Sequence, residues 1–265
     1  MEAFNHTPVL LNECLEALNI KPDGVYVDGT FGGGGHSSQI LKAIKTGKLI
    51  GIDKDTFAIQ NAKAKYENFE NLIMVHDDFK NFKNIMKELN IEKVDGILLD
   101  LGVSSYQLDE ATRGFSYMQE NELDMRMDKS QSLTAKDVVN TYEEAELARI
   151  LFEYGEEKFS KQIARRICEE RQDKEIVTTK ELVDIIEKSI PFSYKKEGGH
   201  PAKRTFQAIR IEVNNEIEPL YNTVKDCIDV LEPGGRLCII TFHSLEDRAV
   251  KNAYADAVGK CTCPS

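Results

Sequence analysis

Residues 24–36 read Gly24-Val25-Tyr26-Val27-Asp28-Gly29-Thr30-Phe31-Gly32-Gly33-Gly34-Gly35-His36, and this stretch decides the fold that the sequence predicts. A short β-branched and aromatic run ends in an acid, a glycine cluster follows, and residues 37–44 then carry apolar side chains at helical spacing. Strand, glycine loop and helix in this order form the first half of a βα unit. Because glycines let a ligand lie against bare backbone at the mouth of a sheet, we interpret the loop as a ligand site.

Asp28, the acid before the glycines, helps to predict which class of ligand the loop binds. A dinucleotide-binding loop of the pattern G-x-G-x-x-G places a pyrophosphate on the helix N-terminus. Here Asp28 stands at the strand end, where its charge would repel a phosphate and disfavours a nicotinamide oxidoreductase. A ligand with a cationic amino group, such as S-adenosylmethionine, suits this acid instead. A tight turn with an N-terminal helix cap is the structural alternative.

Two further acids end predicted strands. Asp53 ends a strand over 48–53, at the spacing expected for an acid that holds ribose hydroxyls. Asp100 ends the near-continuous apolar run 94–100, which is typical of a buried parallel strand. Because the carboxyl ends of parallel strands meet at one edge of a sheet, we expect these two acids and Asp28 to face one crevice. For Asp100 the alternative is a helix-capping acid.

The rest of the chain predicts an α/β fold whose parallel sheet is interrupted by helices after the fourth strand. A third strand over 72–76 leads to Phe79, which either flanks an adenine or packs in the core. Helical patterns cover 6–18, 56–66, 134–152, 156–171, 178–189, 204–231 and 245–257, and a turn over 231–235 precedes a fifth strand over 236–241.

Composition narrows the class of protein. The 265 residues are 41% hydrophobic, enough for a packed core, and carry a formal net charge of −11, so any contact with nucleic acid must be local. The six cysteines are scattered apart from the terminal pair Cys261 and Cys263, which favours reduced thiols over a disulfide framework. We find neither a membrane-spanning apolar run nor a signal peptide, and expect a cytoplasmic protein without a membrane partner.

Nine motifs in order carry a resemblance to a known family. They lie at residues 6–11, 28–32 with 34–36, 100–105, 113–116, 123–128, 154–157, 200–202, 204–208 and 242–248. Across essentially its whole length the sequence resembles the bacterial small-subunit ribosomal RNA cytosine methyltransferases of the MraW type. The resemblance implies methylation of the exocyclic 4-amino group of one cytidine in 16S ribosomal RNA, with S-adenosyl-L-methionine as the cofactor.

The family's fold is expected to be a Rossmann-like class I methyltransferase with a helical insertion after strand four. We expect a first methyltransferase part with the cofactor site over 1–107, a helical insertion for RNA recognition over 108–200, and a second methyltransferase part over 201–265. Relatives continue into a basic tail with further strands, so we expect the family's C-terminal strands to be missing and strand five to form an edge. The resemblance implies cofactor contacts at Gly34, Gly35, His36, Asp53, Phe79, Asp100 and Gln107.

The chemistry of a cytosine amine supports a catalytic role for Asp100. The amine's lone pair is delocalised into the ring, so a catalyst must align it with the methyl group and accept hydrogen bonds from its protons. An aromatic clamp for the base remains open between Tyr106, Phe115 and Phe242, each of which could instead pack in the core. For His243 two roles are predicted: contact with the base or an RNA phosphate of the substrate, or packing within the protein. The sulfonium is already activated, so we expect no metal.

Basic residues give two candidate RNA contacts. The first cluster, around the loop at Gly198 and Gly199, consists of Lys195, Lys196, Lys203, Arg204 and Arg210, of which Lys203 and Arg204 are the expected substrate contacts. The second consists of Lys158, Lys161 and Arg165 on one helix face, which could equally be a solvated face. Structured RNA would present the target as an unstacked base.

Two other functions remain as alternatives. One is a methyltransferase that acts on DNA or on another amine, and the other is a non-catalytic RNA-binding relative that keeps the cofactor fold. The exact nucleotide and the choice between monomer and homodimer stay open.

Overall fold

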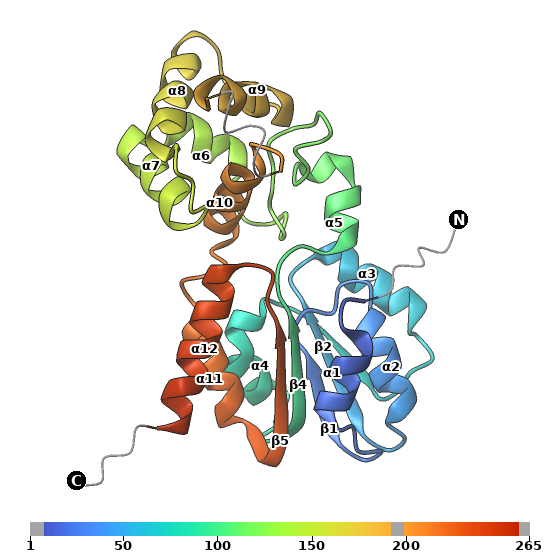
Figure 1. Cartoon of the computed structure of the whole chain (residues 1–265). Coiled ribbons are helices and arrows are strands. Elements are labelled where there is room, and N and C mark those ends of the chain that lie inside the picture. The colour runs from blue at the N-terminus through green and yellow to red at the C-terminus, as the bar shows by residue number, and fades with distance from the viewer. Residues whose placement is uncertain (1–7, 192–198, 260–265) are drawn as a thin grey trace, which may run out of the picture. The chain divides into compact units, whose positions relative to one another are not determined.

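The computed structural model describes residues 8–191 and 199–259 and divides the chain into two compact units (Figure 1). The first unit combines the segments Met1–Ser104 and Ile217–Ser265, and the second is the continuous segment Ser105–Glu216. The second unit therefore interrupts the first between its fourth strand and the helix that precedes its fifth. No helix in the described part of the chain is long and apolar enough to cross a membrane.

The first unit alternates strands and helices, as the sequence predicts. Its elements are α1 (Leu11–Leu18), β1 (Val25–Asp28), α2 (Gly35–Ala43), β2 (Lys48–Asp53), α3 (Thr56–Lys65), β3 (Leu72–His76), the 3-10 turn η1 (Phe79–Asn81), α4 (Phe82–Glu88), β4 (Val94–Asp100), α11 (Leu220–Asp229), β5 (Leu231–Ile240) and α12 (Ser244–Val258). The expected start of the first helix at His6 lies outside the described residues.

All five strands are parallel and lie in the order β3-β2-β1-β4-β5. The chain winds outward from β1 to β3 on one side and through β4 to β5 on the other. Sheets of this kind bind ligands outside the carboxyl ends of the strands at the point where the order reverses. That point lies between β1 and β4, where Asp28 and Asp100 are the last strand residues.

Helices cover both faces of the sheet, which is why its central strands read as near-continuous apolar runs. Figure 1 shows α4, α11 and α12 on one face and α1 and α2 on the other. Successive strand residues point to opposite faces, so that Val27 and Leu99 pack into the first layer while Tyr26 and Leu98 pack into the second. Both layers end at the polar carboxyl edge, where the candidate site lies.

The fifth strand differs from the prediction at its start. It begins at Leu231, five residues before the predicted Arg236, because Leu231 already pairs with Val94. The expected turn at Gly234 and Gly235 is instead an irregularity within the ladder, since the pairing shifts register between Val94 and Gly96. Among the described residues β5 pairs only with β4 and forms one edge of the sheet.

The second unit is helical. It contains α5 (Ser105–Asp109), the 3-10 turn η2 (Ala111–Arg113), α6 (Ala135–Thr141), α7 (Glu144–Glu153), α8 (Ser160–Asp173), α9 (Thr179–Ser189) and α10 (Lys203–Asn214). The predicted helix over 134–152 is two helices, because the chain is extended at Tyr142 and Glu143. The predicted cap of the helix over 178–189 is confirmed, since Thr178 and Glu181 form a capping box.

The prediction of one helix over 204–231 is wrong. Asn215 adopts a left-handed conformation (φ 46°) and ends α10, and Pro219 then precedes the first residue of α11. The break coincides with the division between the units, at Glu216. α10 packs on α6 and α7 within the second unit, so residues 203–214 belong there and not to the segment 201–265 in which the sequence places them.

Candidate active site

Three acids stand at the carboxyl ends of neighbouring strands, as the sequence predicts. Asp28 ends β1, Asp53 ends β2 and Asp100 ends β4, and β1 pairs with both other strands. Their environments differ, however, and the three carboxylates have different functions in the structure.

Asp28 is buried, with 1% of its surface exposed. The Ser37 hydroxyl donates a hydrogen bond to its Oδ2 (2.6 Å), and the backbone N–H of Thr30 donates to its Oδ1 (3.1 Å). Burial raises the pKa of this carboxyl above its ordinary value, and the two hydrogen bonds oppose the rise. The expectation that Asp28 meets the amino group of a ligand is therefore wrong here, because the side chain instead fastens the glycine loop and α2 to the strand.

Thr30 joins the two central strand ends, a role that sequence reasoning missed. Its N–H reaches Asp28, and its Oγ1 accepts a hydrogen bond from the backbone N–H of Asp100 (2.6 Å). The N–H of Gly29 donates to the carbonyl oxygen of Leu98 (2.9 Å), which continues this connection. A hydroxyl residue two positions after the strand-ending acid is the signal that could have indicated this bridge.

The glycine cluster is required partly by packing. Gly34 has φ +72°, and a Cβ there would lie 2.6 Å from the hydroxyl of Tyr66, which donates a hydrogen bond to the Gly34 carbonyl oxygen. A Cβ on Gly35 would lie 2.4 Å from Pro8 Cγ. In contrast, a Cβ on Gly33 would have no other atom within 4 Å. The loop therefore presents bare backbone to open space at Gly33, and contact of Gly34 and Gly35 with a cofactor stays a prediction.

Asp53 binds the same loop from the next strand. Its Oδ2 accepts a hydrogen bond from the N–H of Gly32 (2.6 Å), and its Oδ1 accepts one from the N–H of Asp55 (2.8 Å). Burial raises the pKa of Asp53 to about 6, although both hydrogen bonds favour the charged form. The carboxylate is preorganised at a strand end, and its contact with ribose hydroxyls stays a prediction.

Asp100 is the acid with unused bonding capacity. Its Oδ1 is buried and has no hydrogen-bond partner among the residues that the structure describes. Its Oδ2 lies 3.8 Å from Nδ1 of His36. Burial raises the pKa of Asp100 to about 6; His36 opposes the rise, whereas Asp28 and Glu246 add to it. A buried acceptor without a partner is costly, so this oxygen is suited to a donor from a ligand.

His36 is fixed between two protein groups. Its side chain is buried, and Nε2 lies 3.0 Å from the carbonyl oxygen of Val9 while Nδ1 is directed at Asp100. A ring that donates from Nε2 to the carbonyl has its second nitrogen free to interact with the carboxylate. Contact between His36 and the cofactor stays a prediction, and its described ring contacts are with Val9 and Asp100.

Phe79 lies beside the start of the glycine loop. It is half-buried and packs against the hydrophobic layer that contains Val27, and its Cβ is 3.2 Å from the position that a Cβ on Gly29 would take. Phe79 therefore packs partly in the core, which is one of its two predicted roles. Its contact with an adenine, the other role, stays a prediction.

His243 caps α12, which follows β5. Its Nδ1 accepts a hydrogen bond from the N–H of Glu246 (3.5 Å), and its Nε2 lies 3.2 Å from Oε1 of the same residue. The imidazole is largely buried. Its described contacts therefore agree with the second of its two predicted roles, packing within the protein. Glu246, which sequence reasoning missed, is itself buried, and its Oε2 accepts a hydrogen bond from the N–H of Phe242 (2.8 Å). An acid three residues after a helix cap is the signal that indicates such a contact.

A family model described as the MraW methylase family matches residues 3–265. The chain belongs to this family. It is 59% identical over 262 residues to the ribosomal RNA small subunit methyltransferase H of Clostridium botulinum (strain Kyoto / Type A2), covering 98% of this chain and 84% of that protein. It is 54% identical over 265 residues to the protein of the same name from Ruminiclostridium cellulolyticum, covering 98% and 85%. A solved rRNA methylase from Streptococcus thermophilus aligns at 17% identity over 45% of this chain and 71% of that chain, with a TM-score of 0.30.

Three aromatic or polar residues singled out in the sequence lie in the second unit. Gln107 is buried on α5, and its contact with the cofactor stays a prediction. Phe115 is also buried, with the guanidinium of Arg113 6.0 Å from its ring centre. Phe115 therefore packs, as its structural alternative proposed, whereas Tyr106 is half-buried.

The expected basic clusters are only partly available to RNA. Lys195 and Lys196 lie outside the described residues. Arg210 is largely buried and makes a two-point ion pair with Glu216, at 2.9 and 2.8 Å, so its inclusion in an RNA-binding cluster is wrong. Lys203 and Arg204 are exposed, and Arg204 Nη1 donates to the carbonyl oxygen of Glu156 (2.6 Å). In the second cluster Lys158, Lys161 and Arg165 are exposed, and Arg165 pairs with Glu169.

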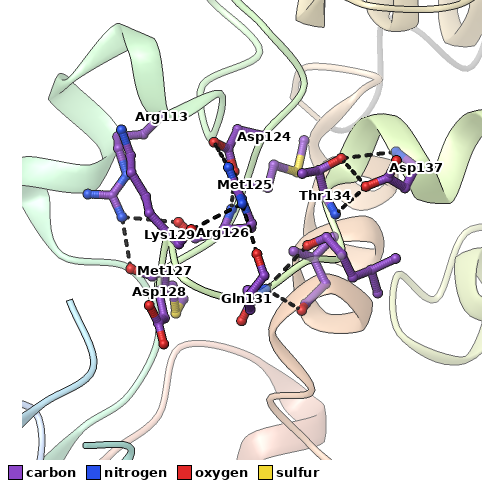
Figure 2. A network of polar contacts seen from close by, with 12 residues as sticks. Arg113, Asp124, Met125, Arg126, Met127, Asp128, Lys129, Gln131, Thr134 and Asp137 are labelled. Atoms are coloured by element: carbon purple, nitrogen blue, oxygen red, sulfur yellow. Dashed lines mark hydrogen bonds and ion pairs between the residues drawn. The ribbon is translucent and has the colours of Figure 1, made fainter. Parts of the chain in front are cut away.

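The motif at residues 123–128 builds a polar network, which Figure 2 shows. Arg126 binds Asp124 through Nε (2.7 Å) and Nη2 (3.0 Å) and donates from Nη1 to two carbonyl oxygens further along the loop. Burial would raise the pKa of Asp124, but its hydrogen bonds with Arg126 outweigh burial and hold that pKa below its ordinary value. Arg113 Nη2 donates to the carbonyl oxygens of Arg126 (3.0 Å) and Met127 (2.9 Å).

Asn214 ties this loop to α10. Its Nδ2 donates to the carbonyl oxygen of Met125 (2.8 Å), and its Oδ1 accepts from the N–H of Met127 (2.8 Å). Met125 is held with φ 59°, an uncommon conformation for a residue other than glycine. The motif thus serves the architecture of the second unit. Within the described segments no group of three histidine, cysteine or acidic side chains could hold a metal, and Cys261 and Cys263 lie outside them.

Proposed function

We propose that this protein transfers a methyl group to the exocyclic 4-amino group of one cytidine in 16S ribosomal RNA. The names of its relatives from Clostridium botulinum and Ruminiclostridium cellulolyticum support the RNA of the small ribosomal subunit as the substrate class. The observation that carries the reaction is Asp100, whose Oδ1 is buried without a partner among the described residues at the point where the strand order reverses. Because its proposed substrate is ribosomal RNA, we propose the cytoplasm as its location.

A hydrogen-bond acceptor is what a cytosine amine requires. The nitrogen is a poor nucleophile until an acceptor at its N–H group helps it to become tetrahedral. Asp100 offers Oδ1 for that contact. Its backbone is held by Thr30 and its Oδ2 faces His36, so the acceptor is oriented before the substrate binds. After methyl transfer the nitrogen must lose a proton, and a carboxylate whose pKa is about 6 can accept it near neutral pH.

The residues at the strand ends fit S-adenosylmethionine, which supplies, when bound, a methyl group already activated by a positive sulfur. The residues that would hold it are Gly34, Gly35, His36, Asp53, Phe79, Asp100 and Gln107. Two observations support the fit: open space above the backbone at Gly33, and the preorganised carboxylate of Asp53 at the end of β2, where such folds bind ribose hydroxyls.

RNA binding rests on local positive charge, because the net charge of the chain is −11. Lys203 and Arg204, exposed at the start of α10, are the proposed phosphate contacts. His243 is the third proposed substrate contact; in the described structure its Nε2 lies 3.2 Å from Oε1 of Glu246.

Methyl transfer from labelled S-adenosylmethionine tests the proposed function. The protein is incubated with small ribosomal subunits that lack the modification, with free 16S RNA and with DNA, and nuclease digests are analysed by mass spectrometry. We expect label on the N4 of a single cytidine of the subunit. The Asp100→Asn variant should lose roughly 100-fold in kcat. Label on DNA alone, label on a ring carbon, or cofactor binding without any transfer would each refute the proposal.

A further inference from the structure

Phe242 combines a fixed backbone with an exposed ring. It lies two residues after the end of β5 at Ile240, and 55% of its surface is exposed. Its N–H donates to Oε2 of Glu246 (2.8 Å), a carboxylate that is itself buried. Single exposed apolar residues are ordinary on protein surfaces, and Met118 and Val258 are more exposed than Phe242. What distinguishes Phe242 is its position next to Asp100.

The pairing of β4 with β5 sets that position. Asp100 pairs with Ile240, and the N–H of Leu101 donates to the carbonyl oxygen of Ile240 (3.1 Å). Phe242 therefore lies two residues beyond the partner of Asp100. Its ring lies against the backbone of Gly102, since a Cβ on that glycine would be 3.4 Å from Cδ2 of the ring. Gly102 has φ +93°, and the chain bends at this glycine, two residues after Asp100.

We infer that Phe242 is the surface on which the target cytosine stacks while its amino group reaches Asp100; this inference rests on the proposed function. A base that leaves its helical stack needs an apolar or aromatic face to replace its neighbours. Of the three aromatic residues considered for this contact, Phe115 is buried in the second unit and presents no face. Phe242 presents its ring at the same edge of the sheet as the unpartnered Oδ1 of Asp100. The stacked base would thus meet an acceptor at its 4-amino group.

Steady-state kinetics test the role of the ring. Phe242→Leu keeps an apolar side chain but removes the aromatic face, and Phe242→Tyr keeps that face. We expect Phe242→Leu to lower kcat/KM on small subunits by roughly 10- to 100-fold, the range for the loss of one stacked base, and Phe242→Tyr to retain most of the activity. Phe152→Leu is the matched control, because Phe152 on α7 is 65% exposed and is not among the proposed site residues. Melting temperature and S-adenosylhomocysteine affinity should match those of the wild type in all three variants.

Fluorescence gives a readout that does not depend on turnover. The chain contains no tryptophan, so Phe242→Trp introduces a single indole at the proposed stacking surface. Cytidine is titrated into this variant in the presence of S-adenosylhomocysteine, with Phe152→Trp as the control. Stacking should quench the fluorescence of Phe242→Trp in a saturable manner and leave that of Phe152→Trp unchanged.

The outcomes separate this inference from the proposed function. If the wild-type protein methylates the subunit while Phe242→Leu keeps the wild-type kcat/KM, the stacking role is wrong and the function stands. The same conclusion follows if cytidine quenches both tryptophan variants equally or neither of them. If the wild-type protein transfers no methyl group to the subunit, the proposed function itself fails. Loss of activity in Phe242→Leu with retention in Phe242→Tyr supports the stacking role.

Discussion

Nδ1 of His36 lies 3.8 Å from Oδ2 of Asp100, and the carbonyl oxygen of Val9, 3.0 Å from Nε2, holds the same imidazole in place. This arrangement sets the charge of the proposed catalytic acid. Burial and the carboxylates of Asp28 and Glu246 favour protonated Asp100, whereas His36 favours its anion. Asp100 therefore loses its proton only at about pH 6, and several predictions depend on that balance.

Activity should depend on pH through Asp100. The anion accepts hydrogen bonds from the cytosine amine, and the protonated acid does so poorly. With a pKa of about 6, kcat/KM should fall about tenfold for each pH unit below 6 and become level above 7. Profiles of the wild type and Asp100→Asn on the same small subunits provide the measurement. A wild-type profile that is flat between pH 5 and 7 would show that the charge of Asp100 does not matter.

Stability should show the opposite dependence on pH. The pKa of Asp100 is about 6 in the folded protein and near its ordinary 3.8 in the unfolded chain. Between these values the folded state binds the extra proton, so the free energy of unfolding declines as pH rises from about 4 to about 6. Asp100→Asn removes this decline in the free energy of unfolding, because asparagine does not ionise. Relative to the wild type, the variant should gain about 1–3 kcal/mol between pH 4 and pH 7. Urea unfolding at both pH values checks the sign, and an equal difference at both would contradict it.

Asp53→Ala should weaken both cofactor binding and the glycine loop. The carboxylate accepts hydrogen bonds from Gly32 and Asp55, and its loss leaves two backbone donors without this partner. We expect the free energy of unfolding to fall by about 1–3 kcal/mol and S-adenosylhomocysteine affinity to fall at least tenfold. Calorimetry and urea unfolding measure the two effects. Unchanged affinity would remove Asp53 from the cofactor site, whatever the change in stability.

RNA binding should lose salt dependence when Lys203 and Arg204 are replaced by glutamine. Each phosphate contact contributes close to one unit to the slope of log affinity against log salt concentration, so the double variant should show a slope shallower by about one to two units. The control is Lys180→Gln with Lys188→Gln on α9, which removes the same charge. The proposed contacts are wrong if both double variants change the slope equally.

The loop at residues 123–128 offers a test of stability in the second unit. Arg126 pairs with Asp124 in a half-buried network, and its removal leaves a carboxylate and two carbonyl groups without their partner. Arg126→Ala should therefore cost about 2–3 kcal/mol. Arg165→Ala breaks an exposed pair with Glu169 and should cost about 0.5 kcal/mol or less. Similar losses in the two variants would mean that the network stabilises no more than a surface ion pair does.

The sequence predicted the strand ends because each acid closes an apolar run of strand length. Asp28, Asp53 and Asp100 therefore lie at the predicted edge. The sequence did not reveal that Asp28 would be buried, because its main partner is the Ser37 hydroxyl on the following helix, a tertiary contact. Likewise the orphan Oδ1 of Asp100 depends on the absence of donors from neighbouring elements in the described chain, and no local pattern encodes such an absence.

The second unit was harder to predict. Apolar spacing continues from α10 into α11, so periodicity alone could not place the break at Asn215. The break also determines the partner of Arg210. The sequence predicted this residue as part of an RNA-binding cluster because other basic residues lie near it in the chain. The turn brings Glu216 back against it, six residues later, and neutralises it.

The split of the first unit into two chain segments imposes an order on its folding during synthesis. β4 is complete at Asp100, but its neighbour β5 begins only at Leu231, about 130 residues later. At translation rates of about 5–20 residues per second, roughly 6–26 seconds pass between the synthesis of β4 and that of β5, and during this time one edge of β4 is unpaired. The continuous segment 105–216 emerges entirely within that interval and can fold first. An unpaired, strongly apolar strand edge is a target for chaperones and for aggregation, so the nascent chain is most vulnerable between the release of β4 and the arrival of β5.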